Sequence, residues 1–287
     1  MTLEEAIAKI KPLDHNAMEI AQKRWDSIAK PLHSLGKLET LLIQIAGITG
    51  NAEVDLSRRG LIVMCADNGV VEEGVTQTGQ EVTAIVAENF LKYDTSVGVM
   101  CKQNHAEIFP VDMGMVTDTK VRTDHKIAYG TQNMTKGPAM TREQAVKGLE
   151  AGIDMVRELN DKGYRILATG EMGIGNTTTS SAVASVLLKQ PVEEMTGRGA
   201  GLTSEGLVRK INAIKKAITL NKPDPEDAID VLAKVGGLDI AGMAGVFLGG
   251  AVYGIPVVMD GFISCVSARL RGIIFLHPMY QKSLLPI

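Results

Sequence analysis

The sequence is poor in aromatic residues, cysteine and histidine, and each scarcity argues against a class of protein. Phe, Trp and Tyr make up 4% of the residues, and the formal net charge is -3. Proteins that bind nucleic acid usually carry a basic stripe with interleaved aromatic residues, so that class is excluded. The cysteines, Cys65, Cys101 and Cys265, are odd in number and far apart, which predicts no disulfide framework. We therefore expect a protein of the reducing cytoplasm.

The sequence also gives little sign of a metal site or a membrane segment. Its five histidines share no ligand spacing, and no metal site is predicted. Asp67, Glu72 and Glu73 could suggest one, but carboxylates at strand ends usually cap turns. The residues up to Pro12 mix Glu and Lys with apolar residues, as an amphipathic helix does and a signal peptide does not. The glycine-rich run Ala241–Val258 predicts a buried helix leading into a strand, with a membrane span as the less favoured alternative.

Hydrophobic periodicity predicts an initial pair of helices followed by alternating strands and helices. Helical spacing covers residues 17–29 and 37–47. Short apolar runs then predict strands over 61–66, 106–111, 165–168 and 255–259, and helical spacing predicts helices over 80–91, 142–159, 177–188, 204–220 and 239–252. Residues 117–139 are polar and predict a long loop, and a further helix is expected to start near Glu226. This alternation favours an α/β fold, a parallel sheet flanked by helices.

Polar, glycine-containing segments follow each predicted strand. They are Ala66–Thr76, Asp112–Gly114, Thr169–Thr179 and Asp260–Phe262. The carboxyl ends of parallel strands lie at one edge of a sheet, and ligands bind there. The four segments should therefore meet in one crevice.

The segment after the third strand has the sharpest chemical meaning. Its glycines, Gly173 and Gly175, precede a helix expected to begin near Thr177. Such a loop directs free backbone N–H groups outward, and the helix dipole favours an anion, so a phosphate is the natural ligand. A dinucleotide-binding loop would need a third glycine and a triphosphate-binding loop a lysine, and both are missing here. The simpler alternative is a helix cap with turn glycines.

Other residues near this loop could assist it. Glu171 would be unfavourable beside an anion unless it holds a ribose hydroxyl or moves a proton, and a capping role is the alternative. A second glycine-rich loop, Gly197–Gly201, also precedes a helix. Arg198 and Lys210 could bring positive charge to a phosphate, although a flexible turn with a solvated arginine is the simpler interpretation of that loop alone.

Several motifs resemble those of the nicotinate-nucleotide:dimethylbenzimidazole phosphoribosyltransferase family. The N-terminal signature is similar to Lys30–Glu39, and the first loop with its following helix is similar to Ala66–Thr83. The most specific motif is Gly170–Thr178, in the order Gly-Glu-Met-Gly-Ile-Gly-Asn-Thr-Thr. Gly197–Gly199, Gly236–Met243 and Asp260–Ile263 follow in the family's order, so the resemblance extends over about residues 1–267.

The resemblance implies a fold and a reaction. The fold is a Rossmann-like parallel sheet with a small helical domain, in a homodimer. The implied division is an N-terminal helical segment over residues 1–55, a Rossmann-like phosphoribosyltransferase domain over 56–267, and a tail over 268–287 that does not match the family. The implied enzyme is a pentosyltransferase of cobalamin biosynthesis that needs no cofactor. It moves phosphoribose from nicotinate mononucleotide to 5,6-dimethylbenzimidazole or a related azole, giving α-ribazole 5′-phosphate and nicotinate.

The resemblance also implies roles for particular residues. The residues implied to bind the substrates are Thr76, Gln80, Gly173, Gly175, Asn176, Thr177, Thr178, Arg198, Gly199, Lys210 and Asp260. Thr76 and Gln80 are implied to line the azole pocket. The phosphoribosyl part would be held by the third loop and Lys210, with Asp260 beside it. A carboxylate should remove the azole proton.

The sequence departs from the family after Ser267. The family's principal base, a glutamate in a Gly-Glu-Gly-Thr-Gly-like loop, has no counterpart here, which leaves Glu171 as the carboxylate expected near C1′. A frameshift or premature end would explain the departure. The alternatives are a catalytically impaired form that only binds nucleotide or azole, a non-functional fragment, and a nicotinamide-dependent oxidoreductase. The missing third glycine argues against the last.

Overall fold

The computed structural model describes residues 1–274 and 284–286. The tail expected over residues 268–287 therefore lies partly outside the described residues. Among the described residues, no helix combines the length and the apolar character that crossing a bilayer requires. The glycine-rich run that begins at Ala241 is, as predicted, a buried helix followed by a strand.

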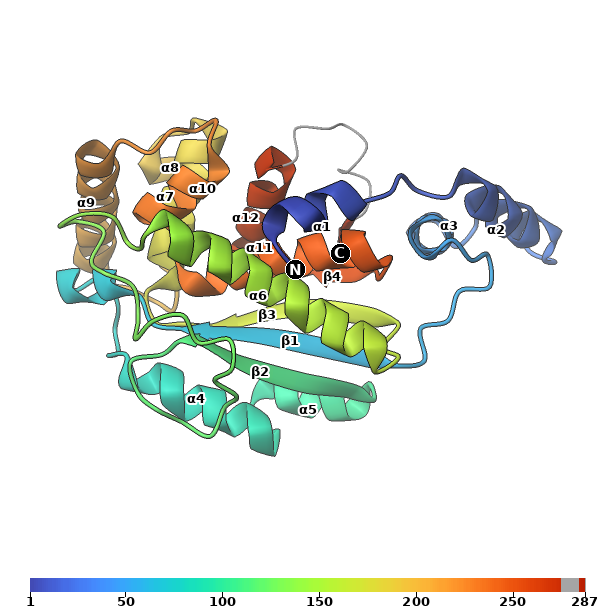
Figure 1. The fold of residues 1–287 in the computed structure, drawn as a ribbon, viewed down its shortest axis with the longest axis horizontal. Helices are drawn as coiled ribbons and strands as arrows, with labels where there is room; N and C mark the ends of the chain where they lie inside the picture. The colour runs from blue at the N-terminus through green and yellow to red at the C-terminus, as the bar shows by residue number, and fades with distance from the viewer. Residues whose placement is uncertain (275–283, 287) are drawn as a thin grey trace.

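A parallel sheet forms the centre of the molecule (Figure 1). Its strands are β1 (Arg59–Ala66), β2 (Ala106–Gly114), β3 (Ile166–Met172), β4 (Val257–Met259) and β5 (Leu284–Pro286). The order across the sheet is β2-β1-β3-β4-β5, and all neighbouring pairs are parallel. The chain first builds outward from β1 to β2 and then crosses to the other side of β1. The first and third strands are therefore neighbours at the point where the direction reverses, which is where α/β sheets open a crevice.

The helices follow the predicted pattern closely. Their bounds are α1 (Leu3–Lys9), α2 (His15–Ser27), α3 (Lys37–Thr49), the 3-10 helix η1 (Gly69–Glu73), α4 (Glu81–Lys92), α5 (Ser96–Gln103), α6 (Arg142–Asp161), α7 (Asn176–Leu188), α8 (Val192–Met195), α9 (Ser204–Asn221), α10 (Ala228–Val235), α11 (Leu238–Tyr253) and α12 (Gly261–Ile274). The helix expected near Glu226 begins at Ala228. Helices α5, α8 and α12 were not predicted, and β3 continues past its predicted end at residue 168 to Met172.

Helices cover the two faces of the sheet unequally. Alternate residues of β1, such as Ile62 and Met64, join the main core with α6 and α11. The residues between them, Leu61 and Val63, belong to a smaller cluster with α4 and α5. Figure 1 shows α6, α11 and α1 on one side of the sheet and α4 and α5 on the other. Because both faces of β1 are buried, its sequence is an unbroken apolar run instead of an alternating one.

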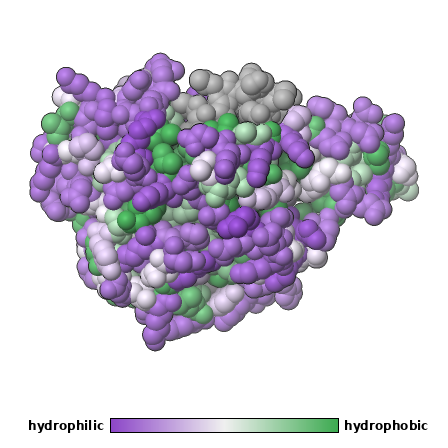
Figure 2. All heavy atoms as spheres, in the orientation of Figure 1, coloured by the Kyte–Doolittle hydropathy of each residue, from purple (hydrophilic) through white to green (hydrophobic). Residues whose placement is uncertain are grey.

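Helices α2 and α3 form an arm that extends from the body of the molecule (Figure 1). They pack on each other through a small cluster that includes Ala17, Ala21 and Ala46. The segment between them exposes large apolar side chains, with Leu32 67% exposed. Figure 2 shows a face that is mostly hydrophilic, with hydrophobic residues in small groups, and the arm as a separate lobe.

Candidate functional site

The candidate site lies where β1 and β3 end side by side. The chain after β1 places Asp67 and Asn68 there, both fully buried. The chain after β3 enters the glycine-rich loop, and Asn68 Nδ2 reaches the Ile174 carbonyl at 3.5 Å. From helix α4, Thr83 Oγ1 accepts a hydrogen bond from the Ile174 N–H at 3.1 Å. The first and third of the predicted segments therefore meet, as the parallel arrangement required.

The glycine-rich loop needs its glycines for two different reasons. A Cβ on Gly173 would lie 2.3 Å from the Ala66 carbonyl oxygen, so only glycine fits against the end of β1. Gly175 has φ of 96° and precedes α7 at its N-cap position, a backbone conformation that glycine adopts without strain. No side chain caps α7. Among the described residues, the N–H groups of Gly175 and Thr177 have no acceptor, and they are available to an anion.

A buried lysine supplies the positive charge next to this helix end. Lys210 of α9 is 1% exposed. Its Nζ donates to Thr177 Oγ1 at 2.8 Å and to the Gly197 carbonyl at 3.2 Å. Burial lowers the pKa of Lys210 to about 8, because the ammonium has lost its hydration. In the described structure no carboxylate pairs with it, and a phosphate would supply the missing negative charge.

A carboxylate pair lies on the other side of Asn176. Glu171 sits in β3, and Asn176 Nδ2 donates a hydrogen bond to its Oε2. Burial raises the pKa of Glu171, while the bond from Asn176 opposes that change. Asp239, the second residue of α11, is completely buried. Burial, and then the charge of Glu171, raise its pKa to about 7. Two carboxyl groups, those of Glu171 and Asp239, are thus largely desolvated at this edge of the sheet.

Thr177 is a lining residue of two cavities. The smaller, about 120 Å³, lies over the glycine-rich loop, and Thr76, Gly173, Gly175, Asn176, Thr177 and Arg198 are among its lining residues. The larger, about 890 Å³, runs along the sheet face that α4 and α5 leave open, and Glu171, Thr177, Gly199 and Asp260 are among its lining residues. Most of the predicted site residues therefore line one or the other of these two cavities.

Four of the predicted site residues are not placed as expected for side chains that lie in the loops and face a ligand. Glu171 belongs to strand β3, because the strand is longer than predicted, and not to the loop. Arg198 is exposed, and its guanidinium donates to the Leu202 carbonyl and to Ser204 within its own loop. Gln80 Nε2 donates to the Asn68 carbonyl at 3.2 Å. Thr178 is fully buried, and its Oγ1 has no partner among the described atoms.

Sequence reasoning did not single out Asp239 or Thr179 as site residues. Thr179 is buried, and its hydroxyl lies 3.5 Å from Asn68 Oδ1. The sequence placed Asp239 in a family motif and in a predicted helix, without a role in the site. The sequence feature that could have identified it is a single carboxylate at the start of a helix that is otherwise apolar and glycine-rich. A charged residue in such a position is rarely buried without a function or a partner.

The side chains of Asp67, Glu72 and Glu73 make structural contacts. Asp67 Oδ2 accepts from the Val116 N–H at 2.8 Å, as a turn-capping carboxylate does. Glu73 accepts from Asn133 and Thr135, and Glu72 pairs with Lys136. The contacts of Glu72 and Glu73 hold η1 against the long loop formed by residues 117–139.

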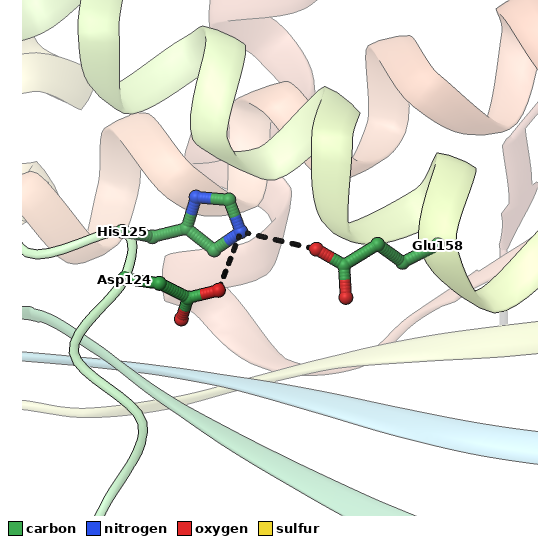
Figure 3. Close-up of side chains that lie close together, drawn as sticks. All are labelled: Asp124, His125 and Glu158. Atoms are coloured by element: carbon green, nitrogen blue, oxygen red, sulfur yellow. Dashed lines mark ion pairs between the residues drawn. The ribbon is translucent and has the colours of Figure 1, made fainter.

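A separate cluster joins that long loop to α6. Figure 3 shows His125 between Asp124 and Glu158, with Nε2 at 3.9 Å from Asp124 and 3.6 Å from Glu158. Among the described residues, these three are the group whose spacing could hold a metal ion. However, Arg122 donates to both carboxylates, with Nε at 2.8 Å from Asp124 and Nη1 at 3.0 Å from Glu158. A guanidinium already balances the charge that would attract a cation, so the cluster is an ion-pair network.

Comparison with known proteins gives one consistent family. A phosphoribosyltransferase family model matches residues 10–272. The chain is 51% identical to the nicotinate-nucleotide–dimethylbenzimidazole phosphoribosyltransferase of Ruminiclostridium cellulolyticum, over 100% of this chain and 81% of that protein. It is 50% identical to the enzyme of the same name from Clostridium acetobutylicum, with the same coverage. The crystal structure of CobT from Thermus thermophilus matches with a TM-score of 0.87 and 34% identity, over 94% of this chain and 81% of that one.

Proposed function

Because the chain belongs to the nicotinate-nucleotide–dimethylbenzimidazole phosphoribosyltransferase family, we propose that it transfers phosphoribose from nicotinate mononucleotide to 5,6-dimethylbenzimidazole. The products are α-ribazole 5′-phosphate and nicotinate, and the reaction belongs to nucleotide-loop assembly of cobalamin. The observation that supports this proposal is that the start of α7 and a desolvated carboxylate lie close together. The N–H groups of Gly175 and Thr177 have no acceptor among the described residues and Lys210 bonds to Thr177, while Glu171 lines the larger cavity that Thr177 also lines.

The phosphate of the nucleotide binds at the start of α7. The N–H groups of Gly175 and Thr177 donate to its oxygens, and the helix dipole and the Lys210 ammonium balance its charge. The backbone N–H groups of Asn176 and Thr178 donate to the Gly173 and Gly175 carbonyls and so hold the shape of this first turn. Arg198 and Gly199 belong to the loop that lies against Thr177, since a Cβ on Gly199 would be 2.9 Å from Thr177 Oγ1. Asp260 lines the larger cavity beside the ribose.

The azole binds beside Thr76 and Gln80 and attacks C1′. The bond from C1′ to the pyridine nitrogen of nicotinate breaks as the bond from C1′ to an azole nitrogen forms on the opposite face, which inverts β to α. The electron pair of the broken bond neutralises the pyridinium, so no acid is needed for the leaving group. The proton on the other azole nitrogen goes to Glu171, whose raised pKa makes it a stronger base than an ordinary carboxylate.

We also propose a homodimer that works in the cytoplasm. The arm of α2 and α3 supports the first part, because its exposed apolar side chains, Leu32, Leu35 and Leu38 among them, suit contact with another subunit. The free thiols of Cys65, Cys101 and Cys265 fit a reducing compartment.

The test of the reaction uses the purified chain with nicotinate mononucleotide and dimethylbenzimidazole. Chromatography should show α-ribazole 5′-phosphate and nicotinate appearing in equal amounts. Glu171→Gln should lose most of the rate and keep its binding of the nucleotide, because the phosphate site is intact. Substitution of an exposed lysine of α9, Lys216→Met, is the matched control and should leave the rate unchanged. Absence of both products from the unaltered chain would exclude the proposed reaction.

A further inference from the structure

The glycine-rich loop before α7 has two glycines in three residues, with Ile174 between Gly173 and Gly175. Glycine adopts a wider range of backbone conformations than any other residue, so such a loop needs a contact from outside to keep one shape. An anion site made of backbone N–H groups binds more tightly when those groups are already oriented, because binding then does not have to order the loop. The side chain that holds Ile174 therefore affects how well the loop can bind a phosphate.

Thr83 lies on a helix that is anchored to the sheet. It is the third residue of α4 and is fully buried. Ala87 and Phe90 follow four and seven positions later, on the same face of the helix, and belong to one apolar cluster with Leu61 and Val63 of β1. The packing of α4 on the sheet thus gives the Thr83 hydroxyl a fixed position beside the glycine-rich loop.

The Thr83 hydroxyl holds one peptide unit of that loop. The Ile174 N–H donates to Thr83 Oγ1 at 3.1 Å. At the other end of the same peptide, the Gly173 carbonyl accepts from the Asn176 N–H at 3.0 Å. The N–H and C=O of a planar trans peptide point in opposite directions, so these two bonds together fix its orientation. Because Asn176 is the first residue of α7, this peptide connects α4 to the start of α7.

The next peptide unit carries an N–H group that is free to bind an anion. Its carbonyl is that of Ile174, which lies 3.5 Å from Asn68 Nδ2. Its N–H is that of Gly175, which has no acceptor among the described residues. The two peptides share the Cα atom of Ile174, so a rotation of the first would also turn the second. The bond from Ile174 to Thr83 therefore helps to set the direction of the Gly175 N–H.

We propose that Thr83 is a positioning residue for phosphate binding, which holds the Gly173–Ile174 peptide so that the Gly175 N–H is oriented before the ligand arrives. Thr83 is not among the residues that line the two cavities at Thr177, so it acts through the loop and does not touch the ligand. The inference rests on the proposed function, because it takes the start of α7 as the site of the nucleotide's phosphate.

Thr83→Val removes the acceptor and nearly keeps the shape of the side chain. The Ile174 N–H then loses its partner, and the flanking glycines allow the peptide to turn. Kd for nicotinate mononucleotide should rise about tenfold, the order of the loss when a backbone donor is left unpaired. Kd for nicotinate riboside, which lacks the phosphate, should stay the same. Thr83→Ser keeps the oxygen and should restore the affinity for the nucleotide. Calorimetry, with competition for the weaker ligand, measures both constants.

Thr131→Val is the matched control. Thr131 is also buried, and its Oγ1 accepts from the Gly69 N–H at 3.1 Å, in the segment after β1 and not in the glycine-rich loop. This variant loses the same kind of bond, so Tm should fall by a similar amount, but the ratio of the two Kd values should not change. If both variants weakened nucleotide binding equally, or if Thr83→Val weakened nucleotide and riboside by the same factor, the role of Thr83 would be structural and the proposal wrong.

Hydrogen exchange of the unaltered chain tests the proposal even if Thr83→Val does not fold. Nuclear magnetic resonance of the backbone amides should show slow exchange at Ile174 and fast exchange at Gly175 and Thr177. Addition of inorganic phosphate should shift the Gly175 and Thr177 signals. An Ile174 amide that exchanges as fast as that of Gly175, or phosphate that shifts neither Gly175 nor Thr177, would overturn the proposal.

These measurements need no turnover, so they separate this inference from the proposed reaction. If the chain shows the expected Kd values and forms no product, the reaction is excluded and the role of Thr83 stands. If products form and Thr83→Val leaves the ratio of the Kd values unchanged, the role of Thr83 is excluded and the reaction stands. Equal Kd values for nucleotide and riboside in the unaltered chain would also overturn the inference, because the loop would then bind no phosphate.

Discussion

Helices α7 and α11 are both buried along most of their length, but they bury opposite kinds of side chain. In α11, the buried residues after Asp239 are apolar or glycine. The buried residues of the first turns of α7 are polar, and the hydroxyls of Thr178 and Ser180 have no partner among the described atoms. Buried polar groups that do not stabilise the packing of the protein are expected where the protein binds a ligand. The contrast suggests that α11 is shaped by packing and the start of α7 by binding.

Substitution of a glycine in α11 should cause the largest loss of stability. A Cβ on Gly245 would lie 2.0 Å from the Leu149 carbonyl oxygen of α6, so the helices would have to separate. Gly245→Ala should lower the free energy of unfolding by about 3 kcal/mol, the upper end of ordinary overpacking. For a chain of this size, that loss lowers Tm by about 6–12 °C. Thermal unfolding followed by circular dichroism measures it. Gly137→Ala, where a Cβ meets nothing within 4 Å, is the control. Equal Tm values would show that close packing does not explain α11.

The second prediction concerns Lys210, which donates a hydrogen bond to Thr177 in the first turn of α7. Lys210→Met removes a buried ammonium, and the free energy of unfolding should stay the same or rise, because burial of that charge is unfavourable. The affinity for nicotinate mononucleotide should fall by about 1.5–3 kcal/mol, the range for a hydrogen bond to a charged group. Isothermal calorimetry and thermal unfolding test the two parts. Lys216→Met, an exposed lysine on the same helix, should change neither. Loss of stability together with affinity would make Lys210 a packing residue.

Much of this arrangement could be predicted from the sequence. The apolar runs at β1 and β2 predicted strands, and the glycine-rich loop predicted the start of α7, because these properties are local. The anion site at that helix start stays a prediction. The length of β3 could not be predicted, since Gly170 and Glu171 are poor strand formers and extend the strand only through pairing with β1. The hydrogen bond from Ile174 to Thr83 was also beyond local patterns. It joins positions on different elements that only the fold brings together.

The third prediction turns the lowered pKa of Lys210 into a dependence on pH. Above about pH 8 this lysine is largely neutral in the free protein, and a bound phosphate should restore its proton. Binding of nicotinate mononucleotide should therefore take up protons between about pH 8 and 10, and affinity should fall by up to about tenfold per pH unit. Calorimetry in buffers of different ionisation enthalpy counts those protons. Lys210→Met should abolish the uptake, and an unchanged uptake would assign it to another group.

The same shift affects stability with a definite sign. The folded-state pKa of Lys210, about 8, lies below its ordinary value of 10.5. The unfolded chain therefore binds more protons between those values, and this group's contribution to stability increases as pH rises through that window. The free energy of unfolding of Lys210→Met should exceed that of the unaltered chain below about pH 8, and this difference should shrink as pH rises towards 10.5.

The smallest effect separates two neighbouring serines of α7. Ser180 and Ser181 are both at most 1% exposed. Ser181 Oγ donates to the Thr177 carbonyl at 2.8 Å, whereas Ser180 Oγ has no partner among the described atoms. Ser181→Ala should therefore cost about 0.5–1 kcal/mol, and Ser180→Ala should be neutral or slightly stabilising, because it removes a buried hydroxyl without a bond. Denaturant titrations of the pair resolve this difference. Equal losses would mean that Ser180 has a partner in solution, such as water, and that the polar burial of α7 is satisfied without a ligand.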